Sequence, residues 1–375
     1  MSATAATHLP ARISLFFFAA LSWAQYYPPS GPSWKKDDTG FDKAKLQEAV
    51  AFALTHDSGW DFKKNQVRTF GRPLGPVPAK RAPANLMIVR NGYIVAEAGE
   101  TQQPDPVYSA AKSFLSVVCG LAVDRGMIRD VNEPVGASIK DGGYDSPHNA
   151  KVTWVHHLRQ VSEWEGETWG KKHDFIGREE FGNGERKPRA LKQPGSHYEY
   201  NDVRVNRFSV SLLRIWQEPL PAVLKRLVMD LIGASDTWKW LGYENSVAEV
   251  NGKQMVSVPG GTRWGGGIQM NTRDLARFGL LLLRDGKWDG RQILSRKWIH
   301  ASIAPGPVGP DYGYLWWLNT RGKQWPSAPR TSFAAVGNGG NIVWIDPEHQ
   351  LVVVWRWYEG KALDAFLAKL LASIR

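Results

Sequence analysis

A serine and a lysine three residues apart, Ser109 and Lys112, are the side chains in this sequence best suited to chemistry. Most positions from 110 to 123 are apolar, and Gly126 follows where a left-handed residue commonly ends a helix. This pattern predicts a buried helix that starts at or just after Ser109, with Lys112 on the same face one turn later. A buried lysine needs a partner or a chemical role, because desolvating its charge is costly. A hydroxyl beside an amine, at a helix N-terminus that favours negative charge, suits nucleophilic attack by serine. The alternative is a serine that only caps the helix, followed by a surface lysine.

The segments on either side of this helix predict the fold that surrounds it. Two short apolar runs flank Asn91-Gly92, the strongest short signal for a β-hairpin, in residues 84–97. Further helices are expected at 41–55, 210–216, 223–232, 271–282 and 363–374, and strands at 314–318, 331–336, 341–346 and 351–358. The order predicts an α+β fold: an antiparallel β-sheet flanked by helices, with an inserted all-helical domain. We expect residues 41–126 and 252–375 to form the sheet domain and residues 127–251 the helical one.

Composition narrows the class of protein. The chain has 375 residues, 43% of them hydrophobic, which is enough for a large core. Its formal net charge of +11 comes from basic residues scattered along the chain, without a nucleic-acid-binding motif, so no nucleic-acid partner is expected. The single cysteine, Cys119, falls inside the predicted buried helix and is interpreted as an inert core residue.

The first 24 residues resemble an export signal. Arg12 precedes an apolar run of about 12 residues that is too short to span a bilayer, and Ser22 and Ala24 supply the small residues of a cleavage site. We therefore expect a signal peptide at 1–24, a flexible mature N-terminus at 25–40, and a secreted or periplasmic protein without stable membrane insertion after the leader is removed. An uncleaved membrane anchor is the alternative.

Four segments in the same order resemble the serine β-lactamase and penicillin-binding-protein superfamily, nearest to its class C-like branch of esterases and 6-aminohexanoate-dimer hydrolases. The segments are Ser109-Ala-Ala-Lys112, the stretch 152–158 with Ser162, the stretch from Pro194-Gly195 to Asp202, and Trp264-Gly-Gly-Gly267 with the helix that follows. No single segment is specific for this superfamily, but the four segments in this order are.

The resemblance implies an acyl-enzyme mechanism. Ser109 is then the nucleophile, and Lys112 a base that stays neutral part of the time. Tyr200 shares the proton transfer, with Tyr198 as its rival, and the sequence does not decide whether Lys112 or Tyr200 is the base. Asp202 stands where the family usually has asparagine.

The third family motif departs from the pattern. A strand that usually carries Lys-Thr-Gly or His-x-Gly is represented by 333–337, followed by Asn338, Gly339, Gly340 and Asn341. The backbone N–H of Asn341, with that of Ser109, is the expected oxyanion hole, and the glycines allow a carbonyl group to approach. The absence of the cation that would grip a β-lactam carboxylate argues against a penicillin specialist. The alternative for this segment is a tight turn between strands.

These observations predict a secreted serine hydrolase of small esters or amides, with no cofactor and no metal. His156 and His157 lie near Glu163 and Glu165, but the spacing matches no zinc motif. Tryptophans near the motifs are candidates for an apolar substrate pocket: Trp164, Trp169, Trp264, Trp316 and Trp317. The alternative function is a catalytically inactive binding module of the cell envelope that keeps the penicillin-recognition fold.

Overall fold

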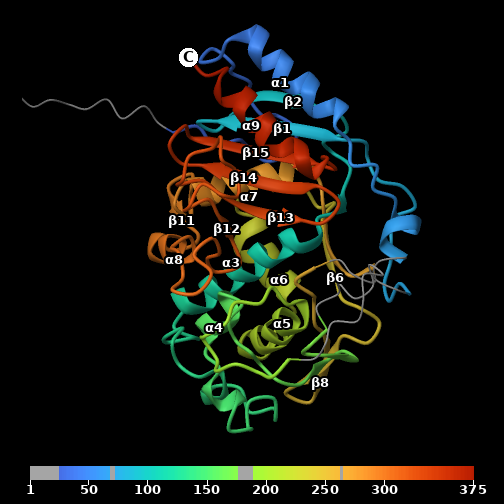
Figure 1. Ribbon diagram of the computed structural model, residues 1–375, viewed down its shortest axis with the longest axis vertical. Coiled ribbons are helices and arrows are strands. Elements are labelled where there is room, and N and C mark those ends of the chain that lie inside the picture. The colour runs from blue at the N-terminus through green and yellow to red at the C-terminus, as the bar shows by residue number, and fades with distance from the viewer. Residues whose placement is uncertain (1–24, 68–71, 176–188, 262–264) are drawn as a thin grey trace, which may run out of the picture.

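A six-stranded antiparallel sheet forms the centre of the larger part of the molecule (Figure 1). The computed structural model describes residues 25–67, 72–175, 189–261 and 265–375, so the leader and Trp264 lie outside the described residues. In order across the sheet, the strands are β12 (Trp317–Leu318), β13 (Phe333–Gly337), β14 (Asn341–Asp346), β15 (Leu351–Arg356), β1 (Asn85–Arg90) and β2 (Tyr93–Ala98). All pairings are antiparallel, as predicted.

Helices cover both faces of this sheet. Helices α1 (Lys43–Thr55) and α9 (Leu363–Leu371) pack together on one face, and α3 (Ala111–Asp124) and α7 (Thr272–Leu283) lie on the other (Figure 1). Every residue of β14 and β15 is buried, because both faces of these central strands are covered. The predicted α+β class, with helices flanking an antiparallel sheet, is confirmed.

The hairpin β1–β2 forms as the Asn-Gly pair predicts. Asn91 and Gly92 both have positive φ, 52° and 89°, which suits the tight two-residue turn that matches the twist of paired strands. Strand β12 is shorter than expected, because only two residues of the predicted strand at 314–318 pair with β13.

Helix α3 is buried on all sides, as its sequence predicts. A 3₁₀ turn, Tyr108–Ala110, leads directly into α3, and all residues of α3 from 111 to 122 are buried. Phe114 stacks on Phe278 of α7 with ring centroids 3.8 Å apart. Gly126, with φ +69°, follows the end of the helix, and Cys119 is fully buried within it.

The inserted segment 127–251 is not entirely helical, which corrects that part of the prediction. It contains α4 (Trp154–Leu158), α5 (Asp202–Trp216) and α6 (Leu220–Leu224), which continues into a π-helical turn, Lys225–Met229. It also contains two hairpins, β4 (Glu167–Thr168) with β5 (Lys171–Lys172) and β7 (Val247–Val250) with β8 (Lys253–Val256). Strands of two to four residues carry too little periodic pattern to be predicted from the sequence.

A small second sheet connects the two parts of the chain. Strand β9 (Gly267–Met270) lies between β3 (Asp105–Pro106) and β6 (Lys239–Leu241). Strand β3 ends one residue before the 3₁₀ turn, and the N–H of Val107 donates to the carbonyl of Ile268 at 2.9 Å. The hairpin of β10 (Lys287–Trp288) with β11 (Arg291–Gln292) lies beside α7, and helix α8 (Arg296–Ser302) lies beside α3.

The N-terminal segment packs against the core, whereas the sequence suggested a flexible arm at 25–40. Trp34 is buried, and its indole N–H donates to the carbonyl of Gly92 at 2.7 Å. The Arg277 guanidinium of α7 donates to the carbonyls of Pro28 and Pro29 at 3.1 and 2.6 Å. Within the described residues, no helix has the length and apolar character needed to cross a bilayer.

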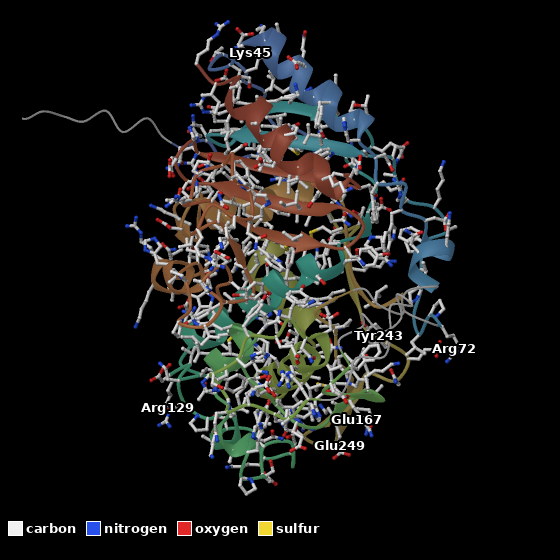
Figure 2. All side chains as sticks on the ribbon, viewed as in Figure 1. Lys45, Arg72, Arg129, Glu167, Tyr243 and Glu249 are labelled. Atoms are coloured by element: carbon white, nitrogen blue, oxygen red, sulfur yellow. The ribbon has the colours of Figure 1, made fainter. Side chains whose placement is uncertain are left out.

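Segments 72–77 and 242–246 lie together at the edge of the inserted part. Figure 2 shows Arg72 and Tyr243 on the same side of the molecule, and Arg72 pairs with Glu244 at 3.3 Å. The N–H of Glu244 also donates to the carbonyl of Leu74 at 2.7 Å. The glycine- and proline-rich segment before β1 therefore reaches the neighbourhood of the inserted part.

Candidate active site

The turn that carries Ser109 is held from both sides. Tyr108 has φ +50°, a left-handed conformation that is uncommon for a bulky residue, and its hydroxyl accepts a hydrogen bond from the indole of Trp60 at 2.9 Å. On the other side, Gly337 of β13 packs so closely that an added Cβ would lie 2.0 Å from the carbonyl oxygen of Val107. A sterically unusual turn at a reactive residue persists only where the surroundings enforce it, as they do here.

Lys112 lies beside Ser109 and is almost completely buried, with 1% of its side chain exposed. Its ammonium group donates a hydrogen bond to Ser109 Oγ at 2.9 Å and lies 2.6 Å from Asp202 Oδ1. The same ammonium sits 4.7 Å from the centre of the Tyr200 ring. The residues singled out as nucleophile, amine and tyrosine are therefore together, and Asp202 is with them.

The charge of Lys112 is set by its neighbours. Burial by itself would lower the pKa of Lys112, but the carboxylate of Asp202 and the nearby Tyr200 outweigh burial and raise that pKa above its usual value. Lys112 is therefore a cation at neutral pH in this arrangement. The sequence-based expectation of a partly neutral lysine is corrected by Asp202, whose position next to the amine was not visible in the sequence.

The start of α5 positions Tyr200 and Asp202. Asn201 is the N-cap of α5, and its side chain accepts from the N–H of Arg204 at 3.0 Å. Asp202 occupies the first turn, where a carboxylate is favoured by the helix dipole. The rings of Tyr198 and Tyr200 both lie near Tyr312, but it is the Tyr200 ring that lies 4.7 Å from the Lys112 ammonium, which favours Tyr200 as the tyrosine next to Lys112.

Three further residues surround this group: Trp317, which was a candidate from the sequence, and Tyr312 and Gly261, which had no signal there. The Tyr200 ring packs against Tyr312 and Trp317, with centroids 6.0 and 5.5 Å away. Burial raises the pKa of Tyr312 well above its usual value, and the hydroxyl accepts from Gln160 at 3.1 Å, so Tyr312 is a neutral support. A Cβ added to Gly261 would lie 4.0 Å from both Ser109 Oγ and Lys112 Nζ, which places this glycine at the site.

The residues after β13 separate into two environments. Asn341 is buried, and its side chain donates to the carbonyl of Asn338 at 2.7 Å and accepts from Arg356 at 2.5 Å. Asn338 itself is exposed. The Asn341 side chain is therefore a structural bridge, and the expected oxyanion role of its backbone N–H stays a prediction.

Gly339 and Gly340 form the turn between β13 and β14, both with positive φ, which agrees with a tight turn at this point. An added Cβ at Gly339 would lie 2.9 Å from the Trp357 ring, and one at Gly340 only 1.9 Å from the carbonyl of Tyr358. The face of β13 that packs toward α3 presents Ala335 and Gly337. Strand β13, Phe333–Gly337, carries no cationic side chain.

The other sequence candidates have structural roles. Trp316 is fully buried in the core, and the indole of Trp164 donates to the carbonyl of Gly143 at 2.7 Å. Trp169 lines a small cavity of about 20 Å³ beside Asp202, which has room for about one water molecule. Of the four candidate tryptophans that the structure describes, Trp317 is the one whose ring packs against Tyr200.

The histidine pair also has structural partners. The His156 side chain completes the capping box of α4, and His157 lies 3.1 Å from the Tyr144 hydroxyl. Within the described residues, no group of three or more histidine, cysteine or acidic side chains is arranged to hold a metal ion.

The antiparallel sheet with a serine–lysine pair at the start of a buried helix defines the class to which this protein belongs. A sequence model of the β-lactamase family matches residues 79–357, and the chain belongs to that family. Over 105 residues it is 29% identical to a 6-aminohexanoate-dimer hydrolase of Paenarthrobacter ureafaciens, a match that covers 24% of this chain and 24% of the relative. The chain thus matches about a quarter of the length of this relative.

Solved structures support the same fold. A Bacillus anthracis protein, provisionally described as a 6-aminohexanoate-dimer hydrolase, has a TM-score of 0.59 and 18% identity over 93% of this chain and 88% of that one. A penicillin-binding-protein homologue from Caulobacter crescentus has a TM-score of 0.60 and 15% identity over 92% of this chain and 99% of that one. Two of these similar proteins carry the name hydrolase.

Proposed function

We propose that the protein is an exported serine hydrolase that cleaves a small ester or linear amide through an acyl-enzyme on Ser109. The observation that carries this proposal is the contact of one buried ammonium, Lys112 Nζ, with Ser109 Oγ at 2.9 Å and Asp202 at 2.6 Å, under the ring of Tyr200. Burying these charged and polar groups together costs free energy. A shared role in proton transfer at Ser109 explains why they are buried side by side.

The reaction needs an acceptor for the proton of Ser109. As the bond from Oγ to the substrate carbonyl carbon forms, the hydroxyl proton leaves, and the leaving alcohol or amine later takes up a proton. A Lys112 that is already protonated cannot accept it unless it passes a proton to Asp202 at the same time. In the second route Tyr200 reacts as a phenolate, its own proton having left to solvent beforehand and its charge being stabilised by the Lys112 ammonium. The phenolate then takes up the proton of Ser109 and becomes a neutral phenol, which can protonate the leaving group.

Labelling with a fluorophosphonate probe tests the nucleophile. The wild-type protein should form a stoichiometric adduct on Ser109, and Ser109→Ala should lose the adduct and lower turnover of a p-nitrophenyl ester by several orders of magnitude, as removal of a catalytic nucleophile does. The thermal midpoint of Ser109→Ala should stay near that of the wild type, because the change removes only one oxygen. A folded wild-type protein that neither labels nor hydrolyses any of a panel of esters, amides and β-lactams would favour the inactive binding module.

The substrate class follows from the strand that faces the nucleophile helix. Ala335 and Gly337 of β13 provide no cation for the carboxylate of a β-lactam, and Asp202 adds a negative charge to the site. Losing one charge-assisted hydrogen bond costs about 1.5–3 kcal/mol, or roughly 10- to 150-fold. The name of a relative, 6-aminohexanoate-dimer hydrolase, also supports a linear substrate. The kcat/KM for a short p-nitrophenyl ester should exceed that for a chromogenic cephalosporin by at least about tenfold, and the reverse order would contradict this substrate class.

Export is proposed from the leader-like sequence at 1–24, with Arg12 before the apolar run and Ser22 and Ala24 before the cleavage point. The mature protein should then begin near Gln25. N-terminal sequencing of protein recovered outside the cytoplasm decides the matter, and an intact Met1 on active protein from the cytoplasm would contradict export.

A further inference from the structure

Glu163 has an unusual conformation for a buried acidic residue. Its φ is +46°, in the left-handed region that glycine adopts most easily, and its side chain is fully buried. Such a conformation is strained and persists only where surrounding contacts enforce it. The contacts here are ionic: Glu163 accepts from Arg189 at 2.6 and 2.8 Å, and from Arg204 at 2.9 Å.

Glu163 belongs to a cluster of four charges, Glu163, Arg189, Glu199 and Arg204, hereafter the ion cluster. Arg204 also donates to Glu199 at 2.9 Å, and Arg189 lies 3.1 Å from Glu199. Each guanidinium therefore contacts both carboxylates, and the formal charges of the cluster cancel. Burial would raise the pKa of Glu163, but Arg189, the N–H of Lys192 and Arg204 together lower it to about 2, so the carboxylate is ionised at neutral pH.

The ion cluster and its neighbours hold the two residues on either side of Tyr200. Glu199, just before Tyr200, is a member of the cluster, and its N–H donates to the carbonyl of Gln160 at 3.0 Å. Asn201, just after Tyr200, donates its N–H to the Gln160 side chain at 2.6 Å and its side-chain amide to the carbonyl of His173 at 2.6 Å. The backbone of Tyr200 is thus fixed at both ends, while its ring lies against the Lys112 ammonium.

A buried ion cluster is by itself weak evidence of a stabilising role. A role in positioning Tyr200 therefore has to be distinguished from a purely structural role in holding α5. The same helix offers a comparison. Asp141 forms a buried ion pair with Arg207 at 2.5 Å and a second with Arg214 at 2.7 Å, both on α5. Arg207 lies one turn beyond Arg204, but Asp141 contacts Arg207, Arg214 and the N–H of Gly143 and not the segment around Tyr200. A cluster that only holds α5 in place should behave like Asp141.

We infer that the ion cluster is a positioning device for proton transfer, in which Glu163 and Arg204 fix Tyr200 against Lys112 through Glu199 and Asn201. This inference rests on the proposed function, because the transferred proton is that of Ser109. Glu163 and Arg204 touch no reacting atom, and they act through the segment that carries Tyr200. A displacement of about 1 Å at a reacting group can cost about 10²-fold in rate, so small shifts of this segment should be visible in kcat.

The test compares Glu163→Gln with Asp141→Asn, two changes that each remove one buried negative charge facing two arginines. With the p-nitrophenyl ester, Glu163→Gln should lower kcat about 10- to 100-fold while KM changes less than about threefold. The pH profile of kcat should also shift, since the position of Tyr200 relative to Lys112 changes. Asp141→Asn, corrected for the folded fraction, should keep kcat within about twofold and keep the profile of the wild type. Equal losses of kcat in the two variants, or an unchanged kcat in Glu163→Gln, would overturn the inference.

A measurement that does not depend on activity separates this inference from the proposed function. In protein labelled with ¹³C-tyrosine, the Tyr200 resonance can be assigned as the signal lost in Tyr200→Phe. Glu163→Gln should move this resonance, and Asp141→Asn should leave it in place. If the wild type fails to label with fluorophosphonate but the resonance moves as described, the proposed function is wrong and the positioning of Tyr200 still holds. If the resonance stays in place in Glu163→Gln, the positioning is wrong whatever the activity.

Discussion

At the scale of single residues, Asp202 favours the protonated form of the Lys112 amine beside Ser109. Burial of Lys112 favours the neutral amine, and the carboxylate 2.6 Å away favours the cation, which prevails. The family resemblance places asparagine at this position, and an amide would not supply the charge. One atom in this side chain therefore changes the chemistry available to Ser109.

Asp202→Asn tests this balance. Without the carboxylate, burial should lower the pKa of Lys112, so more of the amine is neutral near pH 7 and can accept the serine proton. The rising limb of the kcat/KM profile against pH should move about 1–3 units toward lower pH, the usual effect of a removed opposite charge. The measurement is the full profile on the p-nitrophenyl ester for both proteins. Lower activity at every pH with an unmoved limb would instead identify Asp202 as the proton acceptor itself.

At the scale of elements, the site depends on the distance between β13 and the turn that carries Ser109. Gly337 is the residue at the point of closest approach, and a methyl group there would meet the carbonyl oxygen of Val107 at 2.0 Å. Real Cβ atoms do not approach backbone oxygen so closely, so either the strand or the turn has to move. Because β13 and the turn that carries Ser109 are separate elements, a change in the distance between them displaces Ser109 from Lys112.

Gly337→Ala should therefore lower kcat/KM by about 10²-fold, with a loss of about 1–3 kcal/mol in the free energy of unfolding. The control is Gly360→Ala, because an added Cβ at Gly360 has nothing within 4 Å. Ester hydrolysis and urea unfolding of both variants give the two quantities. Wild-type activity in Gly337→Ala would show that β13 does not need this approach.

At the scale of the whole molecule, the site is assembled from two parts of the chain. The sheet-containing part provides Ser109 and Lys112 on α3, and the inserted segment provides Tyr200 and Asp202 at the start of α5. The contact between Lys112 and Asp202 joins the two parts, and both side chains are buried where it forms. Activity therefore reports on the packing of the inserted segment against α3 as well as on the residues themselves.

Buried carboxylates in both parts make stability depend on pH with opposite signs. The pKa of Glu163 is lowered to about 2, whereas burial raises the pKa of Asp274 at the start of α7. The depressed pKa of Glu163 gives stability that is present above the unfolded value of about 4.3 and is lost as pH falls toward 2. The raised pKa of Asp274 gives stability that is present below the unfolded value of about 3.9 and is lost as pH rises through its folded value.

The unfolding free energy of the wild type relative to Glu163→Gln should therefore fall between about pH 5 and pH 2.5, and that relative to Asp274→Asn should rise over the same interval. Urea unfolding at several pH values measures both differences. A difference for Glu163→Gln that does not change with pH would mean that the carboxylate has the same pKa in the folded and unfolded states.

The sequence alone determined the elements that depend on local pattern. The apolar positions from 110 to 123 predicted a buried helix, and the Asn91-Gly92 pair predicted the hairpin, because helix periodicity and turn conformation are properties of neighbouring residues. The spacing of Ser109 and Lys112 predicted their contact for the same reason, since residues three apart on a helix are neighbours. The antiparallel sheet flanked by helices followed from the order of these elements.

Only the tertiary structure decided that Asp202 pairs with Lys112, which is about 90 positions away in the sequence. The family resemblance implied that Tyr200 shares the site, but no local pattern states that the start of α5 lies against α3. The same holds for Tyr312 and Trp317, which pack on Tyr200 from a separate loop and strand, and for Glu163, whose role depends on arginines 26 and 41 residues away. The charge of a buried group is set by everything within a few ångströms of it in space. The protonation of Lys112 was therefore fixed by the fold, although its position beside Ser109 was fixed by the sequence.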